Sequence, residues 1–272
     1  MPLSKLAVCL SVVGAMLLGL APDAHAEEVR IGGTGAALGT MQRMATAFKR
    51  VHPEHQVTVM PSMGSKGGIK AVQAGAIGLA VSARPLSEDE RAKGLVSTVY
   101  GRTPLVFATQ VDAPTDALSW QELTQAYAGE RTQWPGGARI RLILRPQGDA
   151  DSELIKAASP AMREAVGLAE QRKGMVFAVT DQEAADHIEK IPGAMGPLTL
   201  AQILSEKRPL KALKLSGVVP EASALADGRY PLQKELLFVT GPKPSAAVQA
   251  FMDFVRSPTG RTLLVQTGHW IP

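Results

Sequence analysis

The clearest chemical signal in this sequence is a glycine-rich loop at residues 32–37 (GGTGAA), which follows the short predicted strand 29–31 and precedes a helical pattern. Glycines between a strand and a helix let backbone N–H groups point into a concavity, and the helix N-terminus adds a field that favours an anion. No lysine follows as in a nucleotide-binding P-loop, and the glycine spacing does not fit the dinucleotide fingerprint. The loop therefore predicts either an anion site or a tight turn from strand to helix.

A second loop of the same kind covers residues 62–68 (SMGSKGG), again between a predicted strand and a predicted helix. Ser65 offers a hydroxyl donor and Lys66 a compensating charge for an anion. The alternative is a solvated turn in which Ser65 is the N-cap of the helix. Two such loops on adjacent strands of one sheet favour a shared anion site.

Two further segments carry candidate ligands. Residues 145–152 (RPQGDADS) follow a predicted strand, and Arg145 can place two parallel N–H donors on an oxyanion. In the same loop Asp149 or Asp151 is expected to act as the N-cap of the next helix. In residues 81–86, Ser82 or Arg84 is expected to face the cleft in which the ligand would bind. The alternative for Arg84 is a place on the surface.

Patterns typical of enzymes are weak. The sequence has no G-x-S-x-G elbow and no H-E-x-x-H motif, and its histidines are too dispersed to indicate a metal site. Ser65 and Lys66 alone lack an oxyanion hole and a third catalytic group. The single cysteine, Cys9, lies in the N-terminal segment that we expect to be removed. We therefore expect no catalytic residue, no metal site and no cofactor.

The elements that position these loops form the alternating pattern of an α/β protein. Pro53 ends the first helix, the capping boxes Ser119-x-x-Glu122 and Thr180-x-x-Glu183 begin two later ones, and Pro160 interrupts another. The predicted strands are 29–31, 56–60, 77–81, 105–109, 139–144, 210–219 and 232–240. The predicted helices are 38–51, 69–74, a segment opened by Ser87, 119–128, 152–168, a segment opened by Thr180, and 246–255.

The first 26 residues have the pattern of a cleaved signal peptide, with Lys5, an apolar stretch over 6–20 and an A-x-A site at residues 24–26. That stretch is short for a membrane span, which needs about 20 residues. We expect residues 27–272 to be exported to the periplasm and not embedded in the membrane. The net charge of +4 comes from scattered residues with no block of five like charges, which argues against a nucleic-acid partner.

Several stretches, read together, resemble one family. They are residues 31–37 (IGGTGAA), 64–71 (GSKGGIKA), 82–86 (SARPL), 118–123 (LSWQEL), 127–130 (YAGE), 192–196 (PGAMG), 228–232 (GRYPL) and 254–260 (FVRSPTG). No single stretch is diagnostic, but their order along nearly the whole mature chain resembles the phosphate-binding proteins of bacterial ABC transporters. These are type II periplasmic solute-binding proteins.

The resemblance implies two α/β lobes, each a mixed sheet flanked by helices, joined by a hinge. Lobe 1 is expected to comprise residues 27–108 and 230–272, and lobe 2 residues 109–229. An anion between them would be held by loop hydroxyls, helix N-terminal amides and an arginine. The residues expected to bind it are the backbone amides of Thr34, Gly35, Ala36 and Ala37, the hydroxyls of Ser65 and Ser82, Arg145, Asp149 and Asp151.

Three positions depart from the family pattern. Ala83 stands where a serine or aspartate is usual, Ala36 replaces a common threonine, and residues 148–151 (GDAD) replace Gly-Ser-Gly-Thr. Two unit charges about 4 Å apart repel by roughly 4 kcal/mol at an effective dielectric constant of 20, so two carboxylates cannot both face a dianion unaided. Either one carboxylate accepts the proton of phosphate while the other caps the helix, or the ligand has changed, or the protein serves in regulation.

The sequence therefore predicts an exported solute-binding protein that captures a small oxyanion, with phosphate favoured, and presents it to the permease of an ABC transporter. The alternative is the same fold with a different ligand, or a ligand-independent regulatory or interaction role in the periplasm.

Overall fold

The computed structural model describes residues 27–271, so the predicted signal peptide lies outside the described residues. Strands and helices alternate along them as the hydrophobic periods predict. The strands are β1 (Glu28–Gly33), β2 (Gln56–Val59), β3 (Leu79–Ser82), β4 (Val96–Gln110), β5 (Ala117–Leu118), β6 (Arg141–Leu144), β7 (Val176–Phe177), β8 (Ala194–Thr199), β9 (Leu210–Ala212), β10 (Lys214–Leu215) and β11 (Gln233–Thr240). The helices are α1 (Gly35–Val51), α2 (Gly64–Gln73), α3 (Glu88–Ala92), α4 (Trp120–Ala128), α5 (Ala150–Ala157), α6 (Pro160–Gln171), α7 (Asp181–Lys190), α8 (Leu200–Glu206), α9 (Ala222–Ala226), α10 (Ala246–Arg256) and α11 (Pro258–Gln266).

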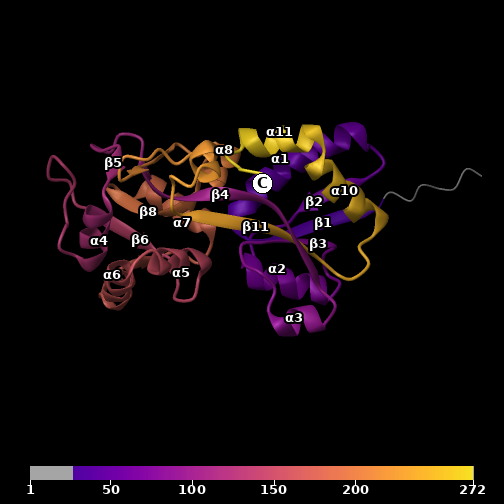
Figure 1. Ribbon diagram of the computed structural model, residues 1–272, viewed down its shortest axis with the longest axis horizontal. Coiled ribbons are helices and arrows are strands. Elements are labelled where there is room, and N and C mark those ends of the chain that lie inside the picture. The colour runs from indigo at the N-terminus through magenta and orange to yellow at the C-terminus, as the bar shows by residue number, and fades with distance from the viewer. Residues whose placement is uncertain (1–26, 272) are drawn as a thin grey trace, which may run out of the picture.

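A mixed sheet of nine strands runs the length of the molecule in the order β2-β1-β3-β11-β4-β8-β6-β7, with β9 also paired to β4. Strand β1 is parallel to β2 and β3, whereas β11 is antiparallel to both β3 and β4. In Figure 1, α1, α10 and α11 lie on one side of the β1–β3 region, and α2 and α3 lie on the other. This arrangement confirms the predicted α/β class with a mixed sheet flanked by helices.

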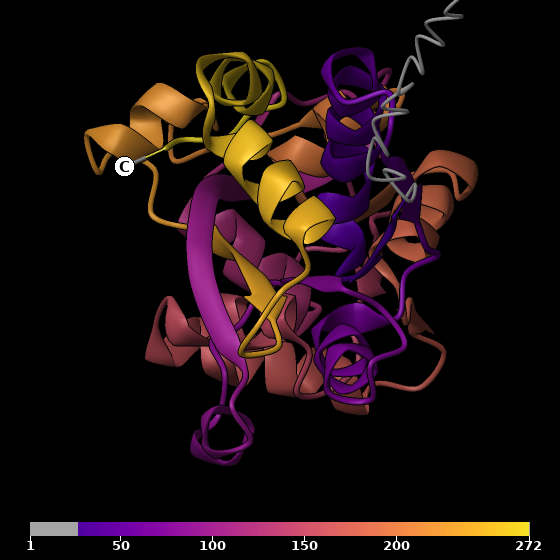
Figure 2. The same ribbon diagram turned by 90° about the vertical axis from the view of Figure 1, so that its right-hand side faces the viewer.

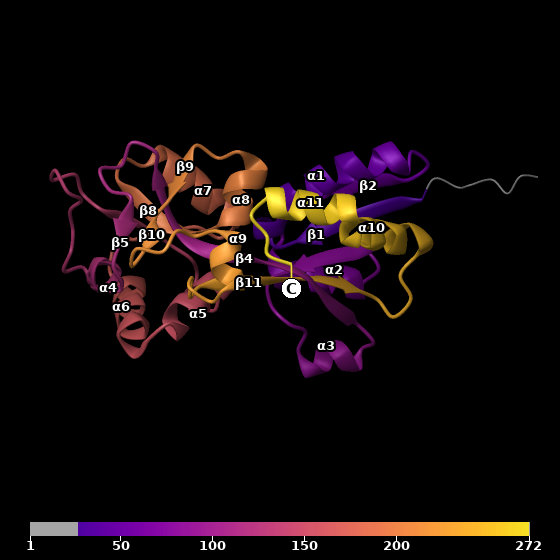
Figure 3. The ribbon, with the colours of Figure 1, turned by 45° about the horizontal axis from the view of Figure 1, so that its top comes forward.

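The elements of the molecule fall into two groups that lie side by side along this sheet (Figure 3). Buried hydrophobic residues form three clusters: one is built from residues between Leu105 and Leu232, and the other two from residues between Val29 and Tyr100 together with residues between Leu236 and Leu264. We call the part around the first cluster the second half of the molecule and the part around the other two the first half. The predicted lobe boundaries at 108/109 and 229/230 lie close to the points where the chain passes from one half to the other. The exact division stays a prediction.

Strands β4 and β11 cross from one half to the other. Strand β4 pairs with β11 over Val96–Pro104 and with β8 over Leu105–Thr109, so one long strand serves both halves. Figure 2 shows how strongly this long strand bends beside β11. The register shifts between Leu236 and Leu237, where Tyr100 is the extra residue on β4. Such a β-bulge bends and twists its strand locally.

Most elements predicted from periodicity are present, and several bounds differ. The capping box of Ser119 and Glu122 is confirmed. Thr180 also caps its helix, because its side chain accepts the Glu183 N–H, but the Glu183 side chain accepts the N–H of Val179, so the second box is only half formed. The predicted strand 210–219 is wrong as one unit: it forms β9 and β10, which pair with β4 and β5, and Ser216 then turns the chain with a φ of 48°. Strand β8 was not predicted, because Gly196 and Pro197 interrupt its apolar pattern.

Gly33 permits the close approach of β1 to β3. Its φ is 133°, and a Cβ there would lie 2.0 Å from the carbonyl oxygen of Val81. We expect Gly33→Ala to lower the free energy of unfolding by at least about 2 kcal/mol, since it combines backbone strain with overpacking. Urea unfolding of the mature protein measures this difference. Gly167→Ala is the matched control: nothing lies within 4 Å of its Cβ position inside α6, so a neutral or slightly stabilising effect is expected.

Candidate ligand-binding site

The carboxyl ends of β1, β2 and β3 bring three of the predicted loops together. The backbone N–H of Thr34 donates to Val81 at 2.9 Å, and the N–H of Met63 donates to Gly33 at 3.2 Å. These two bonds join the loop after β1 to the loops that follow β3 and β2. The predicted proximity of the glycine-rich and serine-rich loops is therefore present in the structure.

Ser65 is in the first turn of α2 and is not its N-cap, because the helix begins at Gly64 and its N-cap is Met63. The Ser65 hydroxyl accepts the backbone N–H of Ala83 at 2.9 Å. That contact uses an acceptor lone pair, so the hydroxyl proton can still be donated to a ligand. The Ser82 hydroxyl is engaged with Arg84, donating to its carbonyl at 2.7 Å and accepting its N–H at 3.2 Å.

Arg84 is held by α3. Its guanidinium pairs with Glu90 at 2.7 and 2.8 Å, and hydrogen bonding to Arg84 lowers the pKa of Glu90 to about 2. Arg84 is partly exposed and its guanidinium is held by Glu90 of α3, and whether it also faces the cleft stays a prediction.

Five charged side chains gather where the second half faces the N-terminus of α1. We call this group the charge cluster. Four of its members are almost completely buried, with exposed fractions of 4% or less, and the fifth, Asp149, is partly exposed. The cluster consists of Arg145, Asp149, Asp151, Asp181 and Lys234.

Arg145 follows β6 and is fixed by its own loop. Its Nε and Nη2 donate to the two carboxylate oxygens of Asp149 at 3.3 and 3.1 Å, and Nη1 donates to the carbonyl of Ala178 at 3.1 Å. Asp149 also caps α5, since its Oδ1 accepts the N–H of Asp151 at 3.0 Å. The capping role predicted for one of the two aspartates is therefore confirmed for Asp149.

Lys234 joins the cluster from β11, the strand shared by both halves. Its Nζ is in ion-pair contact with Asp151 and lies 3.7 Å from Oδ1 of Asp181. Burial acts to lower the pKa of Lys234, but the two carboxylates outweigh it and raise that pKa. Burial raises the pKa of Asp151, with Lys234 opposing the change. The cation that pairs with Asp151 is thus Lys234, a residue of the same protein.

Asp181 connects the cluster to α1. Its Oδ1 lies 3.9 Å from Nη2 of Arg145, and its Oδ2 accepts the Thr34 hydroxyl at 3.5 Å. Burial acts to raise the pKa of Asp181, but Lys234, Arg145 and a hydrogen bond from the N–H of Ala36 lower it below its ordinary value. Asp181 is therefore an ionised carboxylate at the N-terminus of a helix, where negative charge is stabilised.

Asp181 thus contacts Thr34 and Ala36 at the start of α1 and also Arg145 in the loop after β6. These predicted site residues therefore meet around one carboxylate. Gly35 lies at the same point, since a Cβ on it would lie 2.8 Å from Oδ2 of Asp181. The N–H of Ala37 is instead bonded to the carbonyl of Thr34 at 3.2 Å. A cavity beside Arg145, lined also by Ser152 and Glu170, has a volume of about 10 Å³, which suffices for no more than one water molecule.

Sequence reasoning missed Asp181 and Lys234. Lys234 alternates with Leu232 and Leu236 on the inward face of its strand, and a lysine on a buried face calls for a carboxylate partner. Asp181 follows the N-cap Thr180 and was interpreted only as part of a helix start. The alternation of β11 is a usable signal for Lys234, whereas nothing local distinguishes Asp181 from an ordinary first-turn aspartate.

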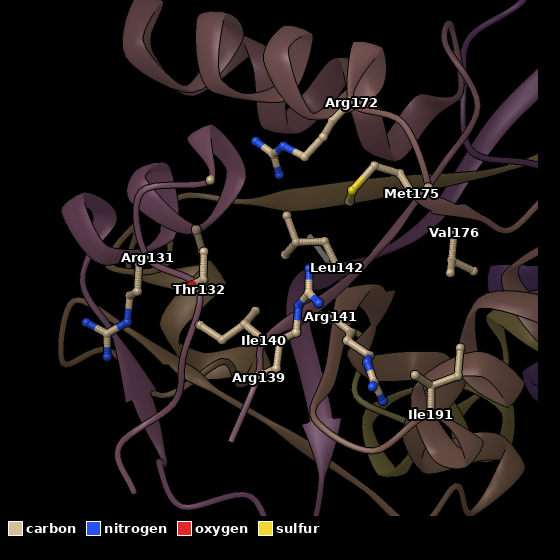
Figure 4. A pocket seen from close by; sticks show the side chains of 13 residues that line it. Arg131, Thr132, Arg139, Ile140, Arg141, Leu142, Arg172, Met175, Val176 and Ile191 are labelled. Carbon is tan, nitrogen blue, oxygen red and sulfur yellow. The ribbon is translucent and has the colours of Figure 1, made fainter. Parts of the chain in front are cut away.

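A separate pocket of about 430 Å³ lies in the second half and contains none of the predicted site residues. Its lining includes Ile140, Leu142 and Met175, and arginine side chains such as Arg139 and Arg172 surround it (Figure 4). Among residues 27–271, no helix is long and apolar enough to cross a membrane. The same residues contain no group of three or more metal-binding side chains placed to hold an ion.

Comparison with known proteins places this geometry in context. A family model described as a PBP superfamily domain matches residues 21–259. The phosphate-binding protein PstS of Bacillus subtilis is 26% identical over 252 residues, covering 90% of this chain and 80% of that protein. PstS of Borreliella burgdorferi is 23% identical over 247 residues, covering 88% of each chain.

Solved structures share the fold. A putative phosphate ABC transporter substrate-binding protein from Clostridium perfringens with bound phosphate gives a TM-score of 0.74 at 20% identity, covering 90% of this chain and 99% of that one. The periplasmic molybdate-binding protein of Azotobacter vinelandii gives 0.62 at 16% identity, also covering 90% and 99%. The likeness confirms that the α/β architecture is that of two-lobed periplasmic binding proteins.

The ion pairs of Lys234 lead to a stability prediction. Lys234→Met leaves the buried Asp151 and Asp181 with only Arg145, at 3.9 Å from each, as a cation, so we expect a loss of roughly 3–5 kcal/mol in the free energy of unfolding, measured with urea. Adding Asp151→Asn should recover part of that loss, because it removes one of the stranded charges. Lys211→Met, which breaks a solvent-exposed pair with Asp116, should cost about 1 kcal/mol or less. Equal effects of the two lysine substitutions would contradict the assignment.

Proposed function

The chain belongs to the PBP superfamily, and from that membership we propose that it is an exported solute-binding protein that captures phosphate between its two halves and presents it to the permease of an ABC transporter. The observation that carries the proposal is the convergence of donors on one carboxylate. The Ala36 amide, the Thr34 hydroxyl, Arg145 and Lys234 all face Asp181. Donors that hold a pair of carboxylate oxygens in this way suit an oxyanion of similar size.

The relatives support phosphate as the ligand. The curated proteins that match most of this chain are named phosphate-binding proteins, and one structure of the same fold contains bound phosphate. The residues we propose to contact phosphate are Thr34, Gly35, Ala36, Ser65 and Arg145, as the resemblance of these loops implies. The Ala37 N–H and the Ser82 hydroxyl, which the resemblance also implies, are engaged within the chain.

The charges of the site call for a protonated form of phosphate. With every group ionised, two cations face three carboxylates in the charge cluster. A fully ionised oxyanion would be repelled by them, whereas a phosphate that carries a proton can donate it to Asp149 or Asp151. We therefore propose that the site selects phosphate over sulfate, which carries no proton near neutral pH.

The proposed mechanism is closure of the two halves about strands β4 and β11. Ligand contacts from both halves favour the closed state, and the permease recognises that state. Export through the signal peptide predicted for residues 1–26 would place the protein in the periplasm. The role proposed for the site is binding alone, with no catalytic group.

A second candidate is a regulatory or interaction role that needs no ligand, or the same fold with another ligand. The observation that favours it is that the carboxylate of Asp181 already lies against the donors proposed for the ligand.

The test is a thermal-shift series on the mature protein, stripped of carried-over ligand by partial unfolding and dialysis, with phosphate, arsenate, sulfate and molybdate. Phosphate at a thousand times its Kd should stabilise the folded state by about 4 kcal/mol, or roughly 8–16 °C in Tm, and sulfate should give no shift.

The control pair for this test lies on and beside β6. Arg145→Lys should reduce the phosphate shift, because it removes the planar fork, whereas the same change at the exposed Arg141 should leave the shift intact. The absence of a shift with any oxyanion would overturn the phosphate proposal and favour the second candidate.

A further inference from the structure

The surroundings of Asp181 are those of a bound anion, although Asp181 is part of the chain. One oxygen accepts the Thr34 hydroxyl at 3.5 Å, the carboxylate receives the Ala36 N–H, and two cations lie at 3.7 and 3.9 Å from the other oxygen. Each of these groups belongs to a different element: the loop before α1, the first turn of α1, β11, and the loop after β6. An ordinary first-turn aspartate needs none of them.

The place that Asp181 occupies coincides with the place predicted for the ligand. The loop 32–37 and Arg145 were assigned to the anion site from the sequence, and in the structure they meet at the Asp181 carboxylate. Phosphate therefore cannot reach the same donors while the Asp181 carboxylate remains among them.

Resting on the proposed function, we propose that Asp181 is a tethered competitor of phosphate: its carboxylate occupies the oxyanion position, and phosphate binds by displacing it.

The contact also joins the two halves. Asp181 begins α7, which packs in the second half, whereas α1 belongs to the first. Neighbouring bonds run the same way: Gln182 Nε2 donates to the carbonyl of Gly35 at 3.0 Å, and Arg43 Nε donates to the carbonyl of Ser205 at 2.8 Å. The tethered carboxylate therefore makes contacts to both halves that a ligand would otherwise provide, and it stabilises the closed state without phosphate.

Removal of Asp181 leaves the rest of the cluster paired. Lys234 retains Asp151, and Arg145 retains Asp149 and the carbonyl of Ala178. The substitution is therefore expected to preserve the fold. An internal competitor lowers apparent affinity by the fraction of molecules in which it is bound. We expect Asp181→Ala to tighten phosphate binding, measured by calorimetry, by about tenfold or more.

Asp181→Asn and Asp112→Asn complete the set of variants. The asparagine at 181 keeps the volume but removes the charge, so its gain in affinity should be smaller than that of alanine. Asp112 is exposed, and its change to asparagine removes one negative charge away from the site, so phosphate affinity should not change. If Asp181→Ala fails to fold, Asp181→Asn still tests the charge.

A second measurement needs no ligand. In small-angle scattering of phosphate-free protein, Asp181→Ala should have a larger radius of gyration than the wild type, and phosphate should reduce it again. An unchanged radius would show that Asp181 does not hold the halves together and would overturn the inference.

The outcomes separate this inference from the proposed function. Tighter phosphate binding by Asp181→Ala supports both. Strong phosphate binding by the wild type that is equal or weaker in Asp181→Ala overturns the competitor and leaves the proposed function in place. Binding of phosphate by neither protein overturns the proposed function and the displacement by phosphate, and the scattering result then decides whether Asp181 closes the molecule.

Discussion

One buried group of charges lies where the two halves of this molecule meet, and in it Lys234 pairs with Asp151 and Asp181 while Arg145 is held by Asp149. Removing an ion from water costs several kcal/mol, so each buried member requires its partners within contact distance. The partners come from β11, α5, α7 and the loop after β6, and Asp181 extends the group to α1. The same group of charges therefore connects the candidate site to elements of both halves.

A site that already contains its own negative charge differs from a simple anion cradle. Structures of the same fold come from a protein with bound phosphate and from a molybdate-binding protein, so the fold alone does not select the ligand. Selection has to come from individual residues. Here the charge cluster contains three carboxylates, Asp149, Asp151 and Asp181, against the two cations Arg145 and Lys234.

The sequence predicts what depends on local pattern. Strand and helix periods, the capping of α4 by Ser119 and the anion loops at Thr34 and Arg145 all follow from neighbouring residues. The contact between Thr34 and Asp181 joins residues 147 positions apart, and no period or spacing encodes it. The alternation of inward and outward residues along β11 predicts that Lys234 lies on a buried face, but it does not identify the carboxylates that pair with Lys234. Strand β8 was missed because Gly196 and Pro197 interrupt its apolar pattern; glycine is required at 196 because a Cβ there would lie 2.9 Å from the carbonyl oxygen of Ile143, a requirement of packing that no local pattern shows.

The bulge at Leu236 and Leu237 has a mechanical consequence for the cleft. It lies two residues from Lys234, on a ribbon of two strands that links the halves. A paired ribbon resists bending in its plane but yields to twist, and a bulge concentrates that twist at one point. Lys234 is therefore placed two residues from the point where twist is concentrated, so its buried ion pairs lie beside the bend of the ribbon that joins the two halves.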